Sequence, residues 1–272
     1  MKNSWLNEKT LVITGASSGL GKELTKMLIT NNGCRVIGIG RSKDKFDAFK
    51  KELGPLEEML TVELFDVTDI SRWEEFALKY TQIDGLINCA GILPPFKRAT
   101  DTPIELTKTV LEADYLACVY SINALFRALS ASKAPMIVNV SSSAALLTIA
   151  GTSAYSAAKS ALKSYTEALA VELKGKFYVS LVMPGFAKTD IFRSQKAGAA
   201  NNKLVDSFSM PAEKMAKKIY RGLLKQRKRM VLGKDAHLMD LYYRLFPKSA
   251  PAGTSAVIKS AKTDLFSDVF EK

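Results

Sequence analysis

The stretch TLVITGASSGLGKELTKML, residues 10–28, decides the fold of this chain. It opens with apolar and β-branched residues, which predict a strand buried on both faces. A turn with Gly15, Gly19 and Gly21 follows, and the residues after it have helical spacing. Glycines let a backbone approach a diphosphate closely, and a helix N-terminus offers free N–H groups. The stretch therefore predicts a nucleotide site, with a glycine-rich turn that binds nothing as the alternative.

Strand-like and helix-like segments alternate through the rest of the chain. This alternation predicts an α/β fold with a parallel sheet and helices on both faces. Further strands are expected at residues 35–40, 61–65, 85–88, 135–140, 178–182 and 229–232. No linker or repeat divides the 272 residues. We therefore expect one domain over residues 1–233, with residues 234–272 as its helical C-terminal extension.

The composition excludes several classes of protein. Cys34, Cys89 and Cys118 lack the spacing of metal ligands, so no metal site is expected, and free thiols fit a reducing cytoplasm. No apolar run is long enough to span a bilayer, and the first strand begins too early to leave room for a signal peptide. His237, the single histidine, lies in an apolar stretch and is expected to pack or to cap a helix rather than to catalyse.

Positive charge is concentrated near the C-terminus. Residues 1–192 carry 22 Lys and Arg against 20 Asp and Glu, a net +2, whereas residues 193–272 carry 17 against 7, a net +10. Segment 211–228 is predicted as a basic helix, and segment 238–247 is apolar almost all round and must be covered. Packing against the domain or a dimer partner, contact with a membrane surface and a wall of the substrate pocket remain open. Nucleic acid does not fit, because no binding motif accompanies the charge.

A second pattern points to catalysis. Tyr155 and Lys159 lie four residues apart, on one face of a helix, and Ser142 precedes Tyr155 by thirteen residues. An ammonium group near a phenol lowers the pKa of the phenol, so Tyr155 can exchange a proton in a hydroxyl–carbonyl interconversion. Ser142 would hydrogen-bond the reacting oxygen, and the neighbouring Ser141 and Ser143 are alternatives for this role. Tyrosine and lysine are common on helices, so the pattern gains its weight from the glycine-rich turn.

Together these motifs resemble the short-chain dehydrogenase/reductase family over roughly residues 8–192. The resemblance rests on the order and spacing of Thr14-Gly15-xxx-Gly19-x-Gly21, Asn88-Cys89-Ala90-Gly91, Ser142, Tyr155, Lys159 and Pro184-Gly185. It implies a Rossmann-type doubly wound sheet of about seven strands and a nicotinamide cofactor. It further implies hydride transfer, with Tyr155 as proton donor or acceptor, and assembly into homodimers or homotetramers.

The resemblance also implies which residues bind the cofactor. Those at the glycine-rich turn and at later strand ends are Gly15, Ser17, Ser18, Gly19, Leu20, Gly21, Asp66, Val67, Asn88, Ala90 and Gly91. Those nearer the nicotinamide are Tyr155, Lys159, Pro184, Gly185 and Thr189. Arg41 ends the second strand where a carboxylate would bind the ribose of NAD, and an arginine there fits the 2′-phosphate of NADP. We therefore expect NADP(H), with a solvated surface arginine as the alternative.

One position departs from the family pattern. Residues 110–117 resemble a family helix of the type VxxxNYxG, with Asp114 in place of the asparagine. In the family, the backbone carbonyl of that asparagine holds a water that links the lysine to solvent, and a carbonyl survives any side-chain change. A carboxylate here can also pair with Lys159, which makes Asp114 a fourth catalytic candidate. An aspartate on the helix surface is the alternative.

The predicted function is an NADP(H)-dependent oxidoreductase that acts on a small-molecule carbonyl or alcohol, in the reductive direction. An apolar segment at residues 190–212 should cover the substrate and favours a lipophilic one. Within enzymes, a 3-oxoacyl-thioester reductase is the alternative. A non-catalytic NADP-binding sensor and a membrane-surface adaptor are alternatives of other classes, and the intact Ser142, Tyr155 and Lys159 favour the enzyme. A cytoplasmic location is expected, with peripheral contact at a membrane left open.

Overall fold

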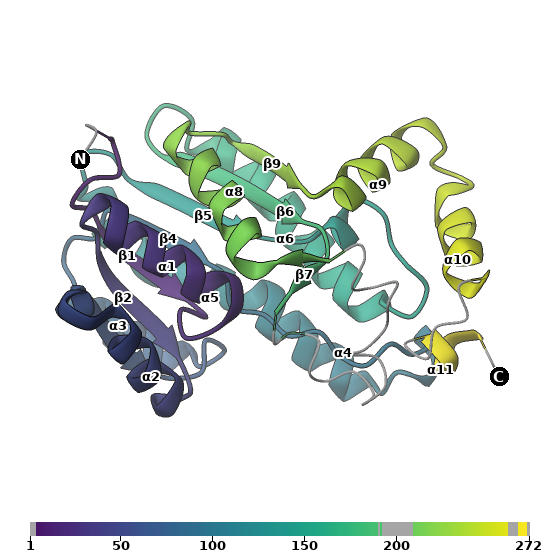
Figure 1. Cartoon of the computed structure of the whole chain (residues 1–272), viewed down its shortest axis with the longest axis horizontal. Helices are drawn as coiled ribbons and strands as arrows, with labels where there is room; N and C mark the ends of the chain where they lie inside the picture. The colour runs from purple at the N-terminus through teal and green to yellow at the C-terminus, as the bar shows by residue number, and fades with distance from the viewer. Residues whose placement is uncertain (1–3, 190, 192–208, 261–265, 271–272) are drawn as a thin grey trace.

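The computed structural model describes residues 4–189, 191, 209–260 and 266–270, and a parallel sheet forms the centre of the molecule (Figure 1). Within those ranges the sheet has seven strands in the order β3-β2-β1-β4-β5-β6-β9, and every neighbouring pair is parallel. The strands are β1 (Thr10–Thr14), β2 (Arg35–Gly40), β3 (Leu60–Leu64), β4 (Gly85–Asn88), β5 (Met136–Val140), β6 (Tyr178–Pro184) and β9 (Arg229–Leu232). The predicted doubly wound α/β sheet is confirmed.

Helices cover both faces of this sheet. One face carries α1 (Gly19–Asn32), α2 (Lys43–Leu53) and α8 (Ala212–Leu224). The other carries α3 (Ile70–Lys79), α5 (Ala117–Ser130) and α6 (Ser153–Glu172). Successive strand residues point to opposite faces, so Ile13 belongs to the first core and Val12 to the second. Burial on both sides explains why the strands are nearly continuous apolar runs.

Local chemistry fixes where the helices begin and end. The Ser42 hydroxyl caps α2 by accepting from the Lys45 N–H at 3.4 Å, and Asp69 caps α3 by accepting from the Arg72 N–H at 3.2 Å. Helix α1 ends at Gly33, whose φ of 62° is left-handed. These caps orient the loops that follow the strands.

Irregular elements gather near the carboxyl ends of the strands. Helix α4 (Ile104–Leu111) runs into α5 through a π-helical turn at Glu112–Leu116. Short 3₁₀ turns lie at Ala99–Asp101 and Ser143–Ala145, whereas a third, at Gly54–Met59, leads into the amino end of β3. A small parallel pair, β7 (Ala187–Lys188) and β8 (Met210–Pro211), lies beside the sheet. The segment expected to cover the substrate falls mainly on residues 190 and 192–208, which lie outside the described residues.

In its described residues, 234–260 and 266–270, the C-terminal extension forms three helices, α9 (Lys234–Leu245), α10 (Ala250–Ser260) and α11 (Ser267–Phe270), at the right of Figure 1. Its inner residues Met239, Phe266 and Val269 share an apolar cluster with Phe96 and Ile149 of the main domain. The Phe96 and Phe266 rings stack with centroids 4.8 Å apart. The apolar segment 238–247 is therefore covered on one side only, because most of its large side chains stay exposed.

Candidate active site

The glycine-rich turn that joins β1 to α1 has a backbone conformation that leaves no room for larger side chains. Gly15 and Gly19 have φ values of +69° and +52°, which strain any residue with a Cβ. A Cβ on Gly15 would lie 3.0 Å from the Ala90 Cα, and one on Gly21 would collide with the Gly15 carbonyl oxygen. The Thr14 hydroxyl accepts from the N–H groups of Cys89 and Ala90, each at 3.0 Å. The two predicted motifs are thus held together at the ends of β1 and β4.

A cavity of about 730 Å³ opens at this edge of the sheet, where the strand order reverses between β1 and β4. Such a switch point is where open α/β sheets bind ligands. Seventeen predicted site residues line the cavity, namely Gly15, Ser17, Ser18, Gly19, Leu20, Gly21, Arg41, Asp66, Val67, Ala90, Gly91, Ser142, Tyr155, Lys159, Pro184, Gly185 and Thr189.

Two predicted site residues lie behind the cavity wall, Asn88 and Asp114. The Asn88 amide donates to the Asn139 side chain at 3.0 Å and accepts from the Ser121 hydroxyl at 2.9 Å. These buried hydrogen bonds tie β4 to β5 and α5, so the side chain of Asn88 is part of the framework.

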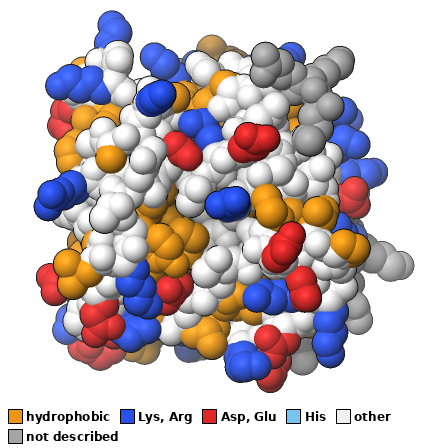
Figure 2. All heavy atoms as spheres, turned by 90° about the vertical axis from the view of Figure 1, so that its left-hand side faces the viewer, with side chains coloured by type: hydrophobic (Ala, Val, Ile, Leu, Met, Phe, Trp, Pro, Cys, Tyr) orange, Lys and Arg blue, Asp and Glu red, His pale blue; other side chains and the backbone are white. Residues whose placement is uncertain are grey.

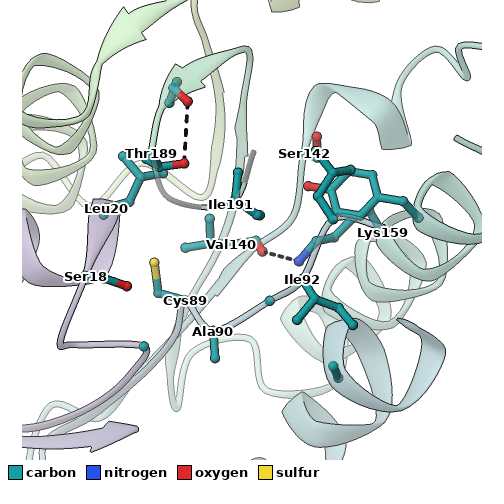
Figure 3. Close-up of a pocket in the computed structure, with 18 of the residues that line it drawn as sticks. Ser18, Leu20, Cys89, Ala90, Ile92, Val140, Ser142, Lys159, Thr189 and Ile191 are labelled. Carbon is teal, nitrogen blue, oxygen red and sulfur yellow. Dashed lines mark hydrogen bonds between the residues drawn. The ribbon is translucent and has the colours of Figure 1, made fainter. Parts of the chain in front are cut away.

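Three of the four catalytic candidates line one wall of the cavity, where Figure 3 labels Ser142 and Lys159. Tyr155 and Lys159 come from the first turns of α6, and Ser142 follows β5. The Lys159 ammonium donates to the Val140 carbonyl at 3.3 Å and lies 5.8 Å from the centre of the Tyr155 ring. Ser18 and Leu20, from the glycine-rich turn, lie across the cavity from this group. A ligand in the cavity therefore meets the turn and the catalytic candidates together.

The pKa of Tyr155 does not follow the expectation from the sequence. Burial raises the pKa of Tyr155 above its ordinary value, and this effect prevails although the charge of Lys159 and a hydrogen bond with Ser142 lower it. The nearby Asp114 raises it further. In this structure Tyr155 is thus a neutral phenol at physiological pH, suited to donate a proton.

Asp114 lies in the π-helical turn and is completely buried, so the surface-aspartate alternative is wrong. One carboxylate oxygen accepts from the Ile92 N–H at 2.7 Å, and the other lies 3.5 Å from the Lys159 Nζ. Burial raises the pKa of Asp114, although Lys159 opposes this. Burial lowers the pKa of Lys159, but Asp114 outweighs it and the net pKa is raised. The pair therefore keeps Lys159 charged beneath Tyr155.

Gly91 leaves room for this ion pair. A Cβ at Gly91 would lie 3.0 Å from an Asp114 carboxylate oxygen and 3.2 Å from the Lys159 Nζ. Both distances are tighter than ordinary van der Waals contact, so an added methyl group would push the pair apart. Both the ion pair and the cavity that Gly91 lines therefore explain why this position is a glycine.

Arg41 lies at the other end of the cavity, after β2. Its side chain is 73% exposed and pairs with Asp66 at 3.2 Å. Burial raises the pKa of Asp66, but hydrogen bonds from Thr68 and the charge of Arg41 hold it below its ordinary value. Lys45 also lines the cavity. Lys45 was not predicted from the sequence, although its position, four residues after Arg41, was the available signal.

The end of the cavity beside Tyr155 is apolar. The individual residues of this apolar wall were not predicted from the sequence. It is lined by Ile92, Leu93, Phe96, Ile149, Phe186 and Ile191. Asp235, at the start of α9, accepts from the Phe186 N–H at 2.6 Å and so fixes the loop after β6. Within the described residues no His, Cys, Asp or Glu cluster could hold a metal ion, and no helix is both long and apolar enough to cross a membrane.

Comparison with known proteins gives one family. The family described as short chain dehydrogenase matches residues 9–200. Dehydrogenase/reductase SDR family member 7B of Xenopus tropicalis is 28% identical over 258 residues, which cover 89% of this chain and 82% of that protein. The 11-beta-hydroxysteroid dehydrogenase 1A of Arabidopsis thaliana is 31% identical over 67% of this chain and 53% of its own length. A Burkholderia cenocepacia short chain dehydrogenase, solved with NADP, has the same fold, with a TM-score of 0.78, 21% identity and coverage of 92% and 98% of the two chains.

Proposed function

Because this chain belongs to the short-chain dehydrogenase family, we propose that it is an NADP(H)-dependent oxidoreductase acting on a carbonyl group or a secondary alcohol. The observation that carries the proposal is the meeting of Ser142, Tyr155 and Lys159 with the glycine-rich turn around one cavity. The NADP bound in the Burkholderia relative supports the choice of cofactor.

The residues present fit a dinucleotide. The glycines of the turn leave the backbone and the N-terminus of α1 open to a diphosphate. Arg41 and Lys45 supply positive charge for a 2′-phosphate, and the end of β2 carries no carboxylate that would repel it. When bound, the nicotinamide supplies or accepts the hydride.

The chain itself handles the proton. The Tyr155 hydroxyl donates its proton to the substrate oxygen as that oxygen gains negative charge, and Ser142 orients the same oxygen by a hydrogen bond. Lys159 stays charged because Asp114 raises its pKa, so its ammonium stabilises the phenolate that remains on Tyr155. Asp114 touches neither substrate nor cavity and is a positioning residue for Lys159.

We further infer a lipophilic substrate, reduced rather than oxidised. Apolar side chains line the cavity beside Tyr155, and they favour an apolar ketone over a small charged one. The similarity to a protein named for hydroxysteroid oxidation supports the same substrate class. A cytoplasmic pool richer in NADPH than in NADP⁺ would favour reduction.

We also expect a homodimer or homotetramer, as in the family. Phe126 on α5 and Val171 on α6 are exposed apolar side chains that a partner subunit would cover. Light scattering coupled to size-exclusion chromatography measures the mass directly.

Turnover of Tyr155→Phe tests the proposed reaction. The variant keeps the ring but loses the transferable proton, so we expect NADPH binding within twofold of wild type and reduction of an apolar ketone lowered by about a thousandfold or more. NADPH fluorescence measures binding and absorbance decay measures turnover. The matched control is Tyr165→Phe, on the same helix but away from the cavity, which should leave both unchanged. Tight NADPH binding without turnover of any ketone would favour the sensor, and no NADPH binding would overturn the proposal.

A further inference from the structure

The outer side of α9 carries an exposed apolar stripe. Leu238, Leu241 and Leu245 are 67%, 55% and 62% exposed, and their spacing places them on one face of the helix. Ala236 and Met239, on the opposite side, are buried against the domain. Phe246, also exposed, follows the stripe directly. Large apolar side chains gathered on one exposed helix face mark a contact surface.

Cations flank this leucine stripe. The turn between α8 and β9 holds Lys225, Arg227 and Lys228, all exposed. It lies beside α9, because Arg229 pairs with Asp240 of α9 at 3.3 Å. Arg244 pairs with the same carboxylate at 3.0 Å, so the charge of Asp240 is already compensated. The surface therefore combines exposed leucines with a net positive border.

From this combination we propose that the leucine stripe and the α8–β9 turn dock onto an anionic membrane surface. An amphipathic helix that lies in a lipid interface inserts apolar side chains at the acyl boundary and places cations among the headgroups. The leucines of α9 and the cations of the turn match these two layers. The docking needs no membrane-spanning helix.

A second copy of the chain fits this surface less well. A two-fold contact places the same patch on both subunits, so two positive borders would face each other and repel.

The face at the left of Figure 1, where α2 and α3 lie, carries Lys, Arg, Asp and Glu side chains interspersed (Figure 2). The excess charge of residues 193–272 is thus not a property of the whole surface.

Docking would also bring the cavity close to the bilayer. Met239 and Tyr242, on the inner side of α9, belong to the same apolar cluster as Tyr155 and Ile149, which line the cavity. This step alone rests on the proposed function: an apolar ketone dissolved in lipid would have a short path to Tyr155. The membrane contact itself is independent of turnover.

Sedimentation with vesicles tests the proposal on the full chain. We expect wild type to bind phosphatidylcholine vesicles with 30% phosphatidylserine at least tenfold more tightly than vesicles of phosphatidylcholine alone. The triple variant Leu238→Ser, Leu241→Ser, Leu245→Ser should bind the anionic vesicles at least tenfold more weakly. The double variant Arg227→Gln, Lys228→Gln should bind the anionic vesicles more weakly, by about fivefold for each charge removed. Raising the salt to 0.5 M NaCl should also weaken the binding of wild type to these vesicles.

Matched controls distinguish binding through this surface from nonspecific adsorption to vesicles. Leu78→Ser, at an 86% exposed leucine on α3, and Lys43→Gln with Lys51→Gln on α2 should leave vesicle binding unchanged. All variants should bind NADPH like wild type, so failure of the docking and failure of the proposed function remain distinguishable. Equal binding to both kinds of vesicle, no binding, or equal losses in the controls would overturn the proposal. If wild type does not bind vesicles and the leucine variant has a lower oligomeric mass than wild type, the stripe is a subunit contact instead.

Discussion

At the scale of single residues, Lys159 connects the parts of the site. It donates to the Val140 carbonyl, lies below the Tyr155 ring and pairs with Asp114. A lysine buried this deeply would lose its proton more easily if it were alone, because burial penalises the charged form. The carboxylate reverses that effect. Asp114 therefore determines the pH range in which Lys159 can assist Tyr155.

The variant Asp114→Asn should shift the pH dependence of turnover. The negative charge of Asp114 raises the pKa of both Tyr155 and Lys159, so its removal lowers both. Since reduction needs both groups protonated, we expect the alkaline limb of kcat/KM to move to lower pH by about one unit or more. The measurement is a pH–rate profile with saturating NADPH. Glu105→Gln, at an exposed carboxylate on α4, is the control, and an unchanged profile in Asp114→Asn would remove Asp114 from the mechanism.

At the scale of elements, the sequence predicted those strands, turns and helices that depend on interactions between neighbouring residues. The strands, the glycine-rich turn and the helix carrying Tyr155 depend on local periodicity. All of them are found, and the strands lie within about two residues of their expected ranges. The pairing of Asp114 with Lys159 was anticipated, whereas the π-helical turn at Glu112–Leu116, which places Asp114 in the interior, was not, because it depends on packing between distant segments. Lys159 lowers the pKa of Tyr155 as predicted, but burial, which is a property of the folded chain, has the larger effect and raises the net pKa.

Helix α11 illustrates an element whose position only the fold reveals. Phe266, just before it, stacks on Phe96, which lines the cavity, and the Arg98 side chain donates to the Val269 carbonyl at 2.9 Å. A Cβ at Gly151 would approach Val269 too closely, so the loop before α6 is shaped around this helix. The end of the chain thus supports the apolar wall of the cavity from behind.

The variant Phe266→Ala should therefore change substrate binding more than chemistry. Without the stacked ring, Phe96 loses its support, and we expect KM for a bulky apolar ketone to rise by about tenfold while kcat changes less than threefold. KM for a small ketone should stay unchanged. Val257→Ala, at an exposed position of α10, is the control. Equal losses for large and small ketones, or weaker NADPH binding, would contradict a supporting role for the C-terminal end.

At the scale of the whole molecule, cofactor binding and stability are linked. A ligand that binds only the folded chain stabilises it, by about 2.7 kcal/mol at a hundred times its dissociation constant. For a domain of this size, each kcal/mol raises Tm by about 2–4 °C. NADPH at that concentration should therefore raise Tm by about 5–10 °C. NADH at the same concentration should raise it less, because only NADPH carries the 2′-phosphate that we propose Arg41 binds.

The variant Arg41→Ala tests that difference. Loss of a charge-assisted contact to the phosphate should weaken NADPH binding by about tenfold to a hundredfold and bring its Tm shift down to that of NADH. Without cofactor, Tm should stay near that of wild type, because the pair between Arg41 and Asp66 is largely exposed and such pairs contribute at most about 1 kcal/mol. Differential scanning fluorimetry measures the Tm of both proteins without cofactor, with NADPH and with NADH. If NADPH and NADH raised the Tm of wild type equally, Arg41 would be a solvated surface residue and the preference for NADP(H) would be wrong.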